Sequence, residues 1–172
     1  MIKRTHGFTI VELLIVIIVI GILATITIVS YRSVQVKAEN ATRLTAVHEW
    51  KKLFETYSAR YGAFPTAPNG TYCLADTSST NNKCGKYKLT GTLTFNSNAA
   101  LSTSLSDVGE IPSTPPIPIN DSVGPYVEYP TSGLSINIYN VFEGKTGTCP
   151  RGLVQTASDS AGAIICRITL LK

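Results

Sequence analysis

The chain opens with an apolar stretch that has the length of a membrane-spanning helix. From Phe8 to Val29 the residues are mostly Ile, Val, Leu and Thr, and the one ionisable side chain is Glu12. As a helix, this stretch would measure about 33 Å, enough to cross a hydrocarbon core of about 30 Å. Because Lys3 and Arg4 precede it, we expect that end to stay in the cytoplasm and the rest of the chain to lie outside.

The pattern then changes from continuously apolar to amphipathic. Between Tyr31 and Tyr61 there is no Gly or Pro, and apolar residues recur at steps of three and four, with one gap near Trp50. This spacing predicts that the helix continues to Tyr61, where Gly62 is suited to cap it. The apolar stripe, which we expect to pack against a sheet, consists of Val34, Ala38, Ala41, Leu44, Val47, Phe54, Tyr57 and Tyr61.

The remaining residues, 62–172, are rich in Gly, Pro, Ser, Thr and Asn, and their strand patterns come mostly late. Residues 99–108 have the pattern of a short helix. Alternating or β-branched runs predict strands at 87–89, 93–95, 126–129, 134–142 and 163–171. One long helix packed on a small antiparallel sheet is an α+β fold, and this is the architecture that we predict.

Neither the net charge nor the sequence motifs point to nucleic-acid binding or to catalysis. The net charge is +4, and two of the positive charges lie before Phe8, so charge alone does not argue for nucleic-acid binding. The chain contains no G-x-S-x-G, no complete P-loop and no H-E-x-x-H motif. We therefore expect no enzymatic activity and no resident cofactor.

All four cysteines follow the apolar stretch, at Cys73, Cys84, Cys149 and Cys166. An even number fits two disulfides formed in an oxidising compartment, whereas a zinc site would usually offer two closely spaced cysteines. Three connectivities are open. We predict the sequence-local pairs, Cys73–Cys84 and Cys149–Cys166, each stabilising the fold by roughly 3 kcal/mol.

Glu12 needs a partner, because a carboxylate within a membrane helix costs about 2.5–3.5 kcal/mol. The stretch itself offers no basic residue. A cut between Gly7 and Phe8 would create an α-amino group one helical turn from Glu12. That amino group could be neutralised by Glu12 of its own chain or of a neighbouring subunit, and the second arrangement would fix the axial register between subunits.

Residues Gly7–Leu14, which read G-F-T-I-V-E-L-L between a short basic leader and an apolar helix, resemble the class III signal of type IV pilins and type II secretion pseudopilins. The resemblance implies a pilin-like fold and cleavage after Gly7 by a membrane prepilin peptidase, which also methylates the new N-terminal Phe8. It implies that Glu12 directs filament assembly. The expected parts are a leader (1–7), a transmembrane and assembly segment (8–30), an amphipathic helical segment (31–61) and an α+β head (62–172).

The function expected from this resemblance is that of a structural subunit, major or minor, of a type IV pilus that serves adhesion, twitching motility or DNA uptake. Its partners would be identical or related pilin subunits, the prepilin peptidase and the pilus assembly platform. The precursor would cross the cytoplasmic membrane once before entering an extracellular filament.

Other interpretations remain open at this point. The chain could be a type II secretion pseudopilin, or a membrane-anchored binding module that never polymerises. A secretory signal peptide would need a small-x-small cleavage site near residue 30, and the matches there are poor. In one respect the chain departs from many major pilins, since it has no proline between Phe8 and Phe64.

Calcium is a further candidate ligand, because some major pseudopilins bind it in C-terminal loops. The acidic residues available are Asp107, Glu110, Asp121 and Asp159. They are scattered and lack the spacing of an EF-hand loop.

Two surface motifs complete the candidate sites. Lys83, Lys86 and Lys88 form a small basic cluster beside Tyr87 that would suit DNA or another surface. Asn40-Ala41-Thr42 and Asn69-Gly70-Thr71 match the acceptor sequence for N-glycosylation, which is common by chance.

Overall fold

The computed structural model describes residues 7, 9–74, 83–84, 95–112, 124–131, 135–144, 149–158 and 162–171. These residues fall into two compact units, one ending at Ala38 and the other beginning at Glu39. Helix α1 (Ile10–Tyr61) contributes to both, so the second unit begins within the helix. The two units are described separately.

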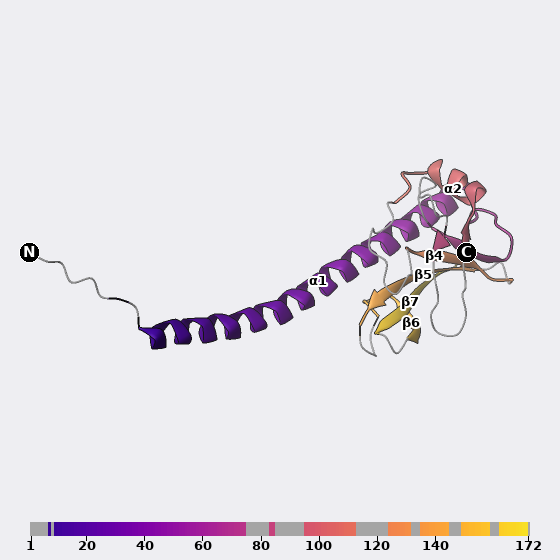
Figure 1. Ribbon diagram of the computed structural model, residues 1–172. Helices are drawn as coiled ribbons and strands as arrows, with labels where there is room; N and C mark the ends of the chain where they lie inside the picture. Colours follow the sequence, from indigo (N-terminus) through magenta and orange to yellow (C-terminus); the bar gives the residue numbers. More distant parts are fainter. Residues whose placement is uncertain are drawn as a thin grey trace, which may run out of the picture. The chain divides into compact units, whose positions relative to one another are not determined.

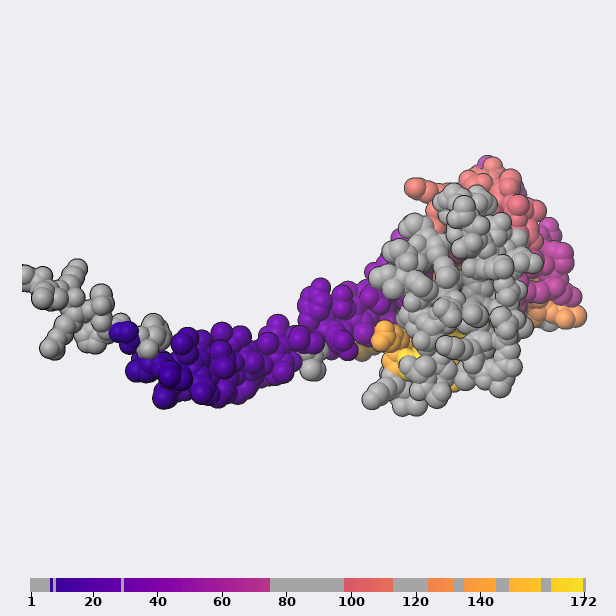
Figure 2. Space-filling view, in the orientation of Figure 1, coloured from indigo at the N-terminus to yellow at the C-terminus, as the bar shows by residue number. Residues whose placement is uncertain are grey.

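The first unit is helical from Ile10 onward, and the indigo atoms of its first turns lie uncovered in the space-filling view (Figure 2). Its apolar side chains are exposed. The large apolar side chains between Ile10 and Ile28 are 47% to 82% exposed. By length and composition, this helix is able to cross a membrane. Thr25 and Thr27 donate their hydroxyl hydrogens to the carbonyls of Ile22 and Leu23, both at 2.7 Å, which satisfies polar groups that lipid would otherwise leave unpaired.

The second unit is built on one mixed sheet with the strand order β2-β3-β1-β4-β5-β7-β6. The neighbouring strands β4, β5, β7 and β6 are labelled in Figure 1. Five strands, β1-β4-β5-β7-β6, are antiparallel, whereas β3 runs parallel to β1. The elements after α1 are β1 (Gly70–Cys73), β2 (Lys83–Cys84), β3 (Phe95–Ser97), α2 (Ala99–Ser106), β4 (Tyr126–Tyr129), β5 (Ser135–Glu143), β6 (Val154–Ser158) and β7 (Ala163–Leu171). The α+β fold predicted from the sequence is confirmed.

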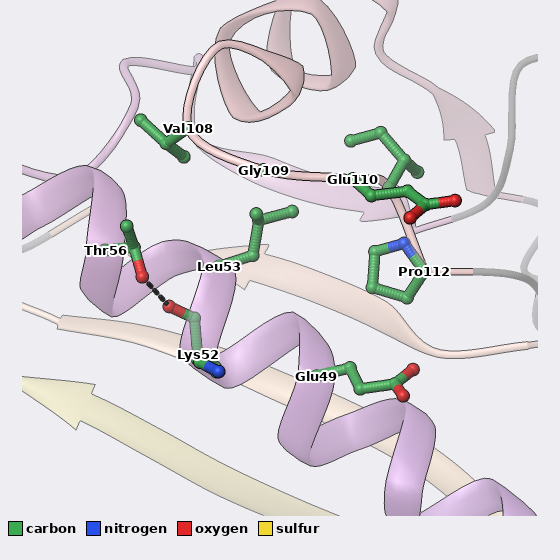
Figure 3. Close-up of a pocket in the computed structure, with 9 residues that line it drawn as sticks. Glu49, Lys52, Leu53, Thr56, Val108, Gly109, Glu110 and Pro112 are labelled. Carbon is green, nitrogen blue, oxygen red and sulfur yellow. Dashed lines mark hydrogen bonds between the residues drawn. The ribbon is translucent and has the colours of Figure 1, made fainter.

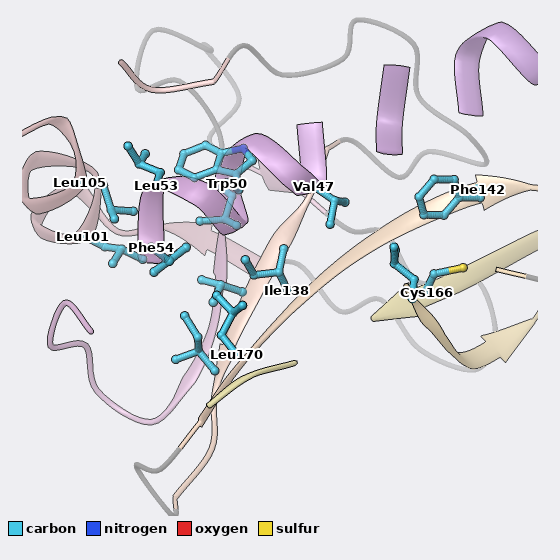
Figure 4. Close-up of a cluster of buried hydrophobic side chains, with 14 of the residues drawn as sticks. Val47, Trp50, Leu53, Phe54, Leu101, Leu105, Ile138, Phe142, Cys166 and Leu170 are labelled. Carbon is cyan, nitrogen blue, oxygen red and sulfur yellow. The ribbon is translucent and has the colours of Figure 1, made fainter. Parts of the chain in front are cut away.

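One face of α1 forms the core with the sheet and α2 (Figure 4). The buried positions follow steps of three and four, as a helix packed along one side requires. Trp50, 1% exposed, fills the gap in the apolar pattern that the sequence left near it. The buried helix residues are Arg43, Ala46, Val47, Trp50, Leu53 and Phe54. The last four pack in one cluster with apolar side chains such as Leu101, Leu105, Ile138, Phe142 and Leu170.

Strand prediction succeeded for β4, β5 and β7, whose apolar or alternating patterns are clear, and failed for β1, β2 and β6. Strands β4 and β7 occupy the predicted ranges, and β5 is displaced by one residue. Strands β1 and β6 were not predicted, because β6 reads V-Q-T-A-S and β1 contains a glycine. The strand expected at 93–95 is instead β3, which begins at Phe95, and the one expected at 87–89 lies outside the described residues.

The end of α1 is capped as expected. Gly62 has φ +74°, and its N–H donates to the Ser58 carbonyl at 2.8 Å. A positive φ favours glycine, because in other residues the Cβ atom makes an unfavourable steric contact with the backbone. The helix therefore ends at Tyr61, and the chain turns toward β1.

Two asparagines connect α1 to the end of β5. Asn40 donates its Nδ2 hydrogen to the Glu143 carbonyl at 2.7 Å and accepts from the Glu143 N–H at 3.0 Å. Asn140, which is fully buried, donates to the Arg43 carbonyl at 3.1 Å. Burial lowers the pKa of the Arg43 guanidinium, while the charges of Glu39 and Glu143 act in the opposite direction.

A disulfide joins Cys149, in the segment before β6, to Cys166 on β7, with a Cα–Cα distance of 5.7 Å. This is the predicted sequence-local pairing. Cys73 is also disulfide-bonded. The side chain of Cys84, its expected partner, lies outside the described residues, so that pairing stays a prediction.

Candidate functional site

Thr9 and Glu12 form a hydrogen-bonded cap at the start of α1. The Glu12 Oε2 atom accepts from the Thr9 N–H at 2.8 Å and from the Thr9 hydroxyl at 2.7 Å. The Glu12 N–H in turn lies 3.3 Å from the Thr9 Oγ1 atom. This reciprocal arrangement is a capping box, in which a Thr and the Glu three residues later satisfy free N–H groups of the first turn.

The cap places the helix start just after the predicted cleavage site. Gly7 is exposed and not helical, and the first helical residue is Ile10. Phe8, the predicted new N-terminus, lies outside the described residues. A peptidase acts most readily on exposed backbone outside regular structure. The Gly7 side of the predicted scissile bond meets this requirement.

The Glu12 carboxylate retains capacity for a second partner. Its Oε1 atom accepts no hydrogen bond from the described residues, since both bonds from Thr9 go to Oε2. A carboxylate offers about four lone-pair sites, so an ammonium group could be accommodated in addition. The cap therefore leaves Glu12 able to bind an α-amino group of its own or a neighbouring chain.

Thr9 is the site residue that the sequence analysis missed. Its signal was present, because Thr9-Ile10-Val11-Glu12 matches the T-x-x-E pattern of a capping box immediately before an apolar run. The motif alone therefore predicts the cap that the structure shows.

The candidate calcium residues do not come together in the part of the chain that the structure describes. Asp107 accepts a hydrogen bond from the Tyr61 hydroxyl, which raises the pKa of Tyr61, and its carbonyl accepts from Arg60 Nη1 at 3.1 Å. Glu110 instead lines a groove of about 620 Å³ between α1 and the segment after α2 (Figure 3). Across the described ranges, no three or more His, Cys, Asp or Glu residues form a group suited to a metal. Asp121 and Asp159 lie outside them.

The basic cluster is described only in part. Lys83 belongs to β2, whereas Lys86, Tyr87 and Lys88 lie outside the described residues. Binding of DNA or another surface by this cluster therefore stays a prediction.

Comparison with known proteins identifies the N-terminal segment. Residues 2–28 match the model of the prokaryotic N-terminal methylation motif. The match covers all of the leader after Met1, then Phe8, Thr9 and Glu12, and most of the apolar part of α1. No curated protein and no solved structure matched the chain.

Proposed function

We propose that this chain, which carries the class III signal of type IV pilins and pseudopilins, is a structural subunit of a type IV pilus. The motif makes it a membrane-anchored precursor for a prepilin peptidase and for assembly with pilin-like subunits. The finer role, as a major or minor subunit of an extracellular filament, is our proposal. That role is structural rather than catalytic and requires no cofactor.

The observation that supports polymerisation is the position of Glu12 in the first part of α1, Ile10–Ile28, which is otherwise apolar on all sides. Between Ile10 and Ile28 the exposed surface is apolar except for this carboxylate and small groups such as the threonine hydroxyls. Apolar side chains permit many axial registers between neighbouring helices. A single charge permits few, because a buried carboxylate needs an ammonium nearby. Pairing between Glu12 and the Phe8 amino group of a neighbour selects the register in which subunits stack.

Neutralising Glu12 tests this proposal. We expect Glu12→Gln and Glu12→Ala to be cleaved after Gly7 yet to yield at least about tenfold less sheared surface filament, because losing a charge pair worth ~1.4 kcal/mol changes an equilibrium tenfold. Processed monomer should accumulate in the membrane. The matched control is Glu49→Gln, which neutralises an exposed glutamate near the other end of α1. Wild-type filament yield from both Glu12 variants would contradict the proposal.

The wild-type chain in the same shearing experiment distinguishes the two alternative functions, a secretion pseudopilin and a tethered binding module. A short filament confined to the cell envelope, with no material released by shearing, favours a secretion pseudopilin. A processed wild-type chain that never forms filaments favours the tethered module.

A further inference from the structure

The chain contains three matches to the N-x-S/T acceptor sequence for N-glycosylation. The structure describes two of them, and they differ in how accessible the asparagine is. The three matches begin at Asn40, Asn69 and Asn120, and Asn120 lies outside the described residues. The sequence pattern is weak evidence by itself, since modification also requires an exposed acceptor outside regular structure. Asn40 and Asn69 differ sharply in this respect.

Asn40 is committed to the fold. It lies within α1, and its amide nitrogen donates to the Glu143 carbonyl at 2.7 Å while its amide oxygen accepts from the Glu143 N–H. Attachment of a sugar at Nδ2 would displace the hydrogen bond to the Glu143 carbonyl. Access to the tripeptide would also require part of the helix to unwind. In the folded protein, Asn40 is therefore not accessible for glycosylation.

Asn69 has the opposite character. It is exposed, lies in the bend just before β1, and its side chain makes no hydrogen bond to the described residues. The residue after it, Gly70, has φ +153°, a conformation that side-chain-bearing residues rarely adopt. A hydrogen bond stabilises the bend, because the Tyr72 hydroxyl donates to the Pro68 carbonyl at 2.9 Å. The Asn69 amide is thus presented at a defined turn with its nitrogen free.

The second recognition element of the acceptor sequence is free as well. Thr71 is partly exposed at the start of β1, where its backbone pairs with Glu128, and its hydroxyl makes no hydrogen bond to the described residues. An enzyme that reads the hydroxyl two residues after the asparagine finds this side chain partly exposed at the start of β1, whereas the acceptor Asn69 itself precedes the strand.

We propose that Asn69 is an N-glycosylation site, with a polyprenyl-diphosphate-linked oligosaccharide as the donor. The Asn69 Nδ2 atom attacks the anomeric carbon, the carbon–oxygen bond to the diphosphate breaks, and the amide proton passes to a base of the transferase. The products are the Asn-linked oligosaccharide and the polyprenyl diphosphate. The inference rests on the proposed function only for export of the head to the face of the membrane where such donors are used.

The test is intact and peptide mass spectrometry of the chain from membrane and filament fractions of the producing cells. We expect the peptide containing Asn69 to carry an oligosaccharide mass, and the peptide containing Asn40 to carry none. The mass should disappear completely in Asn69→Gln and in Thr71→Val, which keeps the size and the strand preference of Thr71. It should persist in Thr71→Ser, which keeps the hydroxyl.

The N-terminus read in the same spectra separates this inference from the proposed function. An unmodified Asn69 in chains that begin at Phe8 overturns the proposed glycosylation site and leaves the proposed function as a pilus subunit unaffected. An oligosaccharide found at Asn40 or Asn120 but not at Asn69 also overturns it. A modified Asn69 in chains that begin at Met1 supports the site and contradicts the pilus subunit. An unmodified Asn69 in chains that begin at Met1 contradicts both.

Discussion

At the scale of single residues, the first turn of α1 shows how Glu12 is accommodated in the uncut chain, and the proposed cut would add a second partner. Before cleavage, two hydrogen bonds from Thr9 stabilise the carboxylate, which lowers the cost of placing it beside lipid. After the proposed cut, the Phe8 amino group would become available as a counter-ion. Because Oε1 is not used by the cap, the second interaction does not require the first to break.

A second residue-scale feature concerns Tyr139 on β5. Its hydroxyl donates to the Glu128 carboxylate at 2.6 Å, and Asn137 donates to the same oxygen at 3.0 Å. Burial and the hydrogen bond to Glu128 raise the pKa of Tyr139 to about 12. An unfolded tyrosine ionises near pH ~10. The stability associated with this shift is therefore complete below pH ~10 and is lost as the pH rises toward 12.

This shift makes a prediction about alkaline stability. We expect the free energy of unfolding to fall between pH ~10 and ~12, and to fall less steeply in Tyr139→Phe, which has no proton to lose. Burial also raises the pKa of Tyr129, so some of the fall should remain. The measurement is denaturant unfolding of the full chain in detergent at several pH values. The control is Tyr31→Phe at an exposed position, and an equal slope in wild type and Tyr139→Phe would contradict the assignment.

At the scale of elements, the contact between α1 and the sheet depends on polar as well as apolar groups. The buried apolar residues of α1, from Ala46 to Phe54, supply the driving force, but apolar side chains alone would tolerate small shifts of the helix. Asn40 instead pairs with both backbone groups of Glu143 at the end of β5. These two hydrogen bonds fix where the helix lies along the sheet within the second unit.

Removing the Asn40 side chain should therefore destabilise the head. We expect Asn40→Ala to lower the free energy of unfolding by about 1–3 kcal/mol, because the Glu143 backbone groups lose their partners. The comparison is Asn69→Ala, which removes an exposed side chain that makes no hydrogen bond to the described residues and should change stability by less than about 0.5 kcal/mol. Both variants should be measured in unglycosylated protein. Equal stabilities would show that the Asn40 contact adds nothing.

The sequence predicted elements where the apolar pattern was long, and missed them where contacts distant in the chain decide. The helix and β7 have extended patterns that leave little choice of structure. Strand β6 has few apolar residues and exists because it pairs with β7 and is held near it by the Cys149–Cys166 disulfide. The Asn40 contact could not be predicted, because it joins residues about one hundred positions apart.

At the scale of the whole molecule, the apolar first unit and the disulfide-bonded second unit suit different surroundings. The first unit exposes apolar side chains that require lipid or other helices. The second unit has its own core and a disulfide, which is typical of chains exported from the cytosol. The head should therefore remain folded whether the helix lies in a membrane or in a filament.

The disulfide should contribute measurably to that stability. Replacing Cys149 and Cys166 together by alanine should lower the free energy of unfolding by about 3 kcal/mol, because the bond closes a loop of 17 residues in the unfolded chain. Chemical denaturation under oxidising conditions measures the difference. It should shrink when both proteins are unfolded in the presence of a reductant, and equal stabilities under oxidising conditions would argue against a structural role.

The central claim is that the chain is cut after Gly7 and assembled into a filament. The most direct measurement is mass spectrometry of the N-terminal peptide from filaments sheared off the producing cells. We predict a peptide that begins at Phe8 and carries one added methyl group on its amino nitrogen. A chain that begins at Met1, or one cut beyond residue 30, in cells with an active prepilin peptidase would contradict the account.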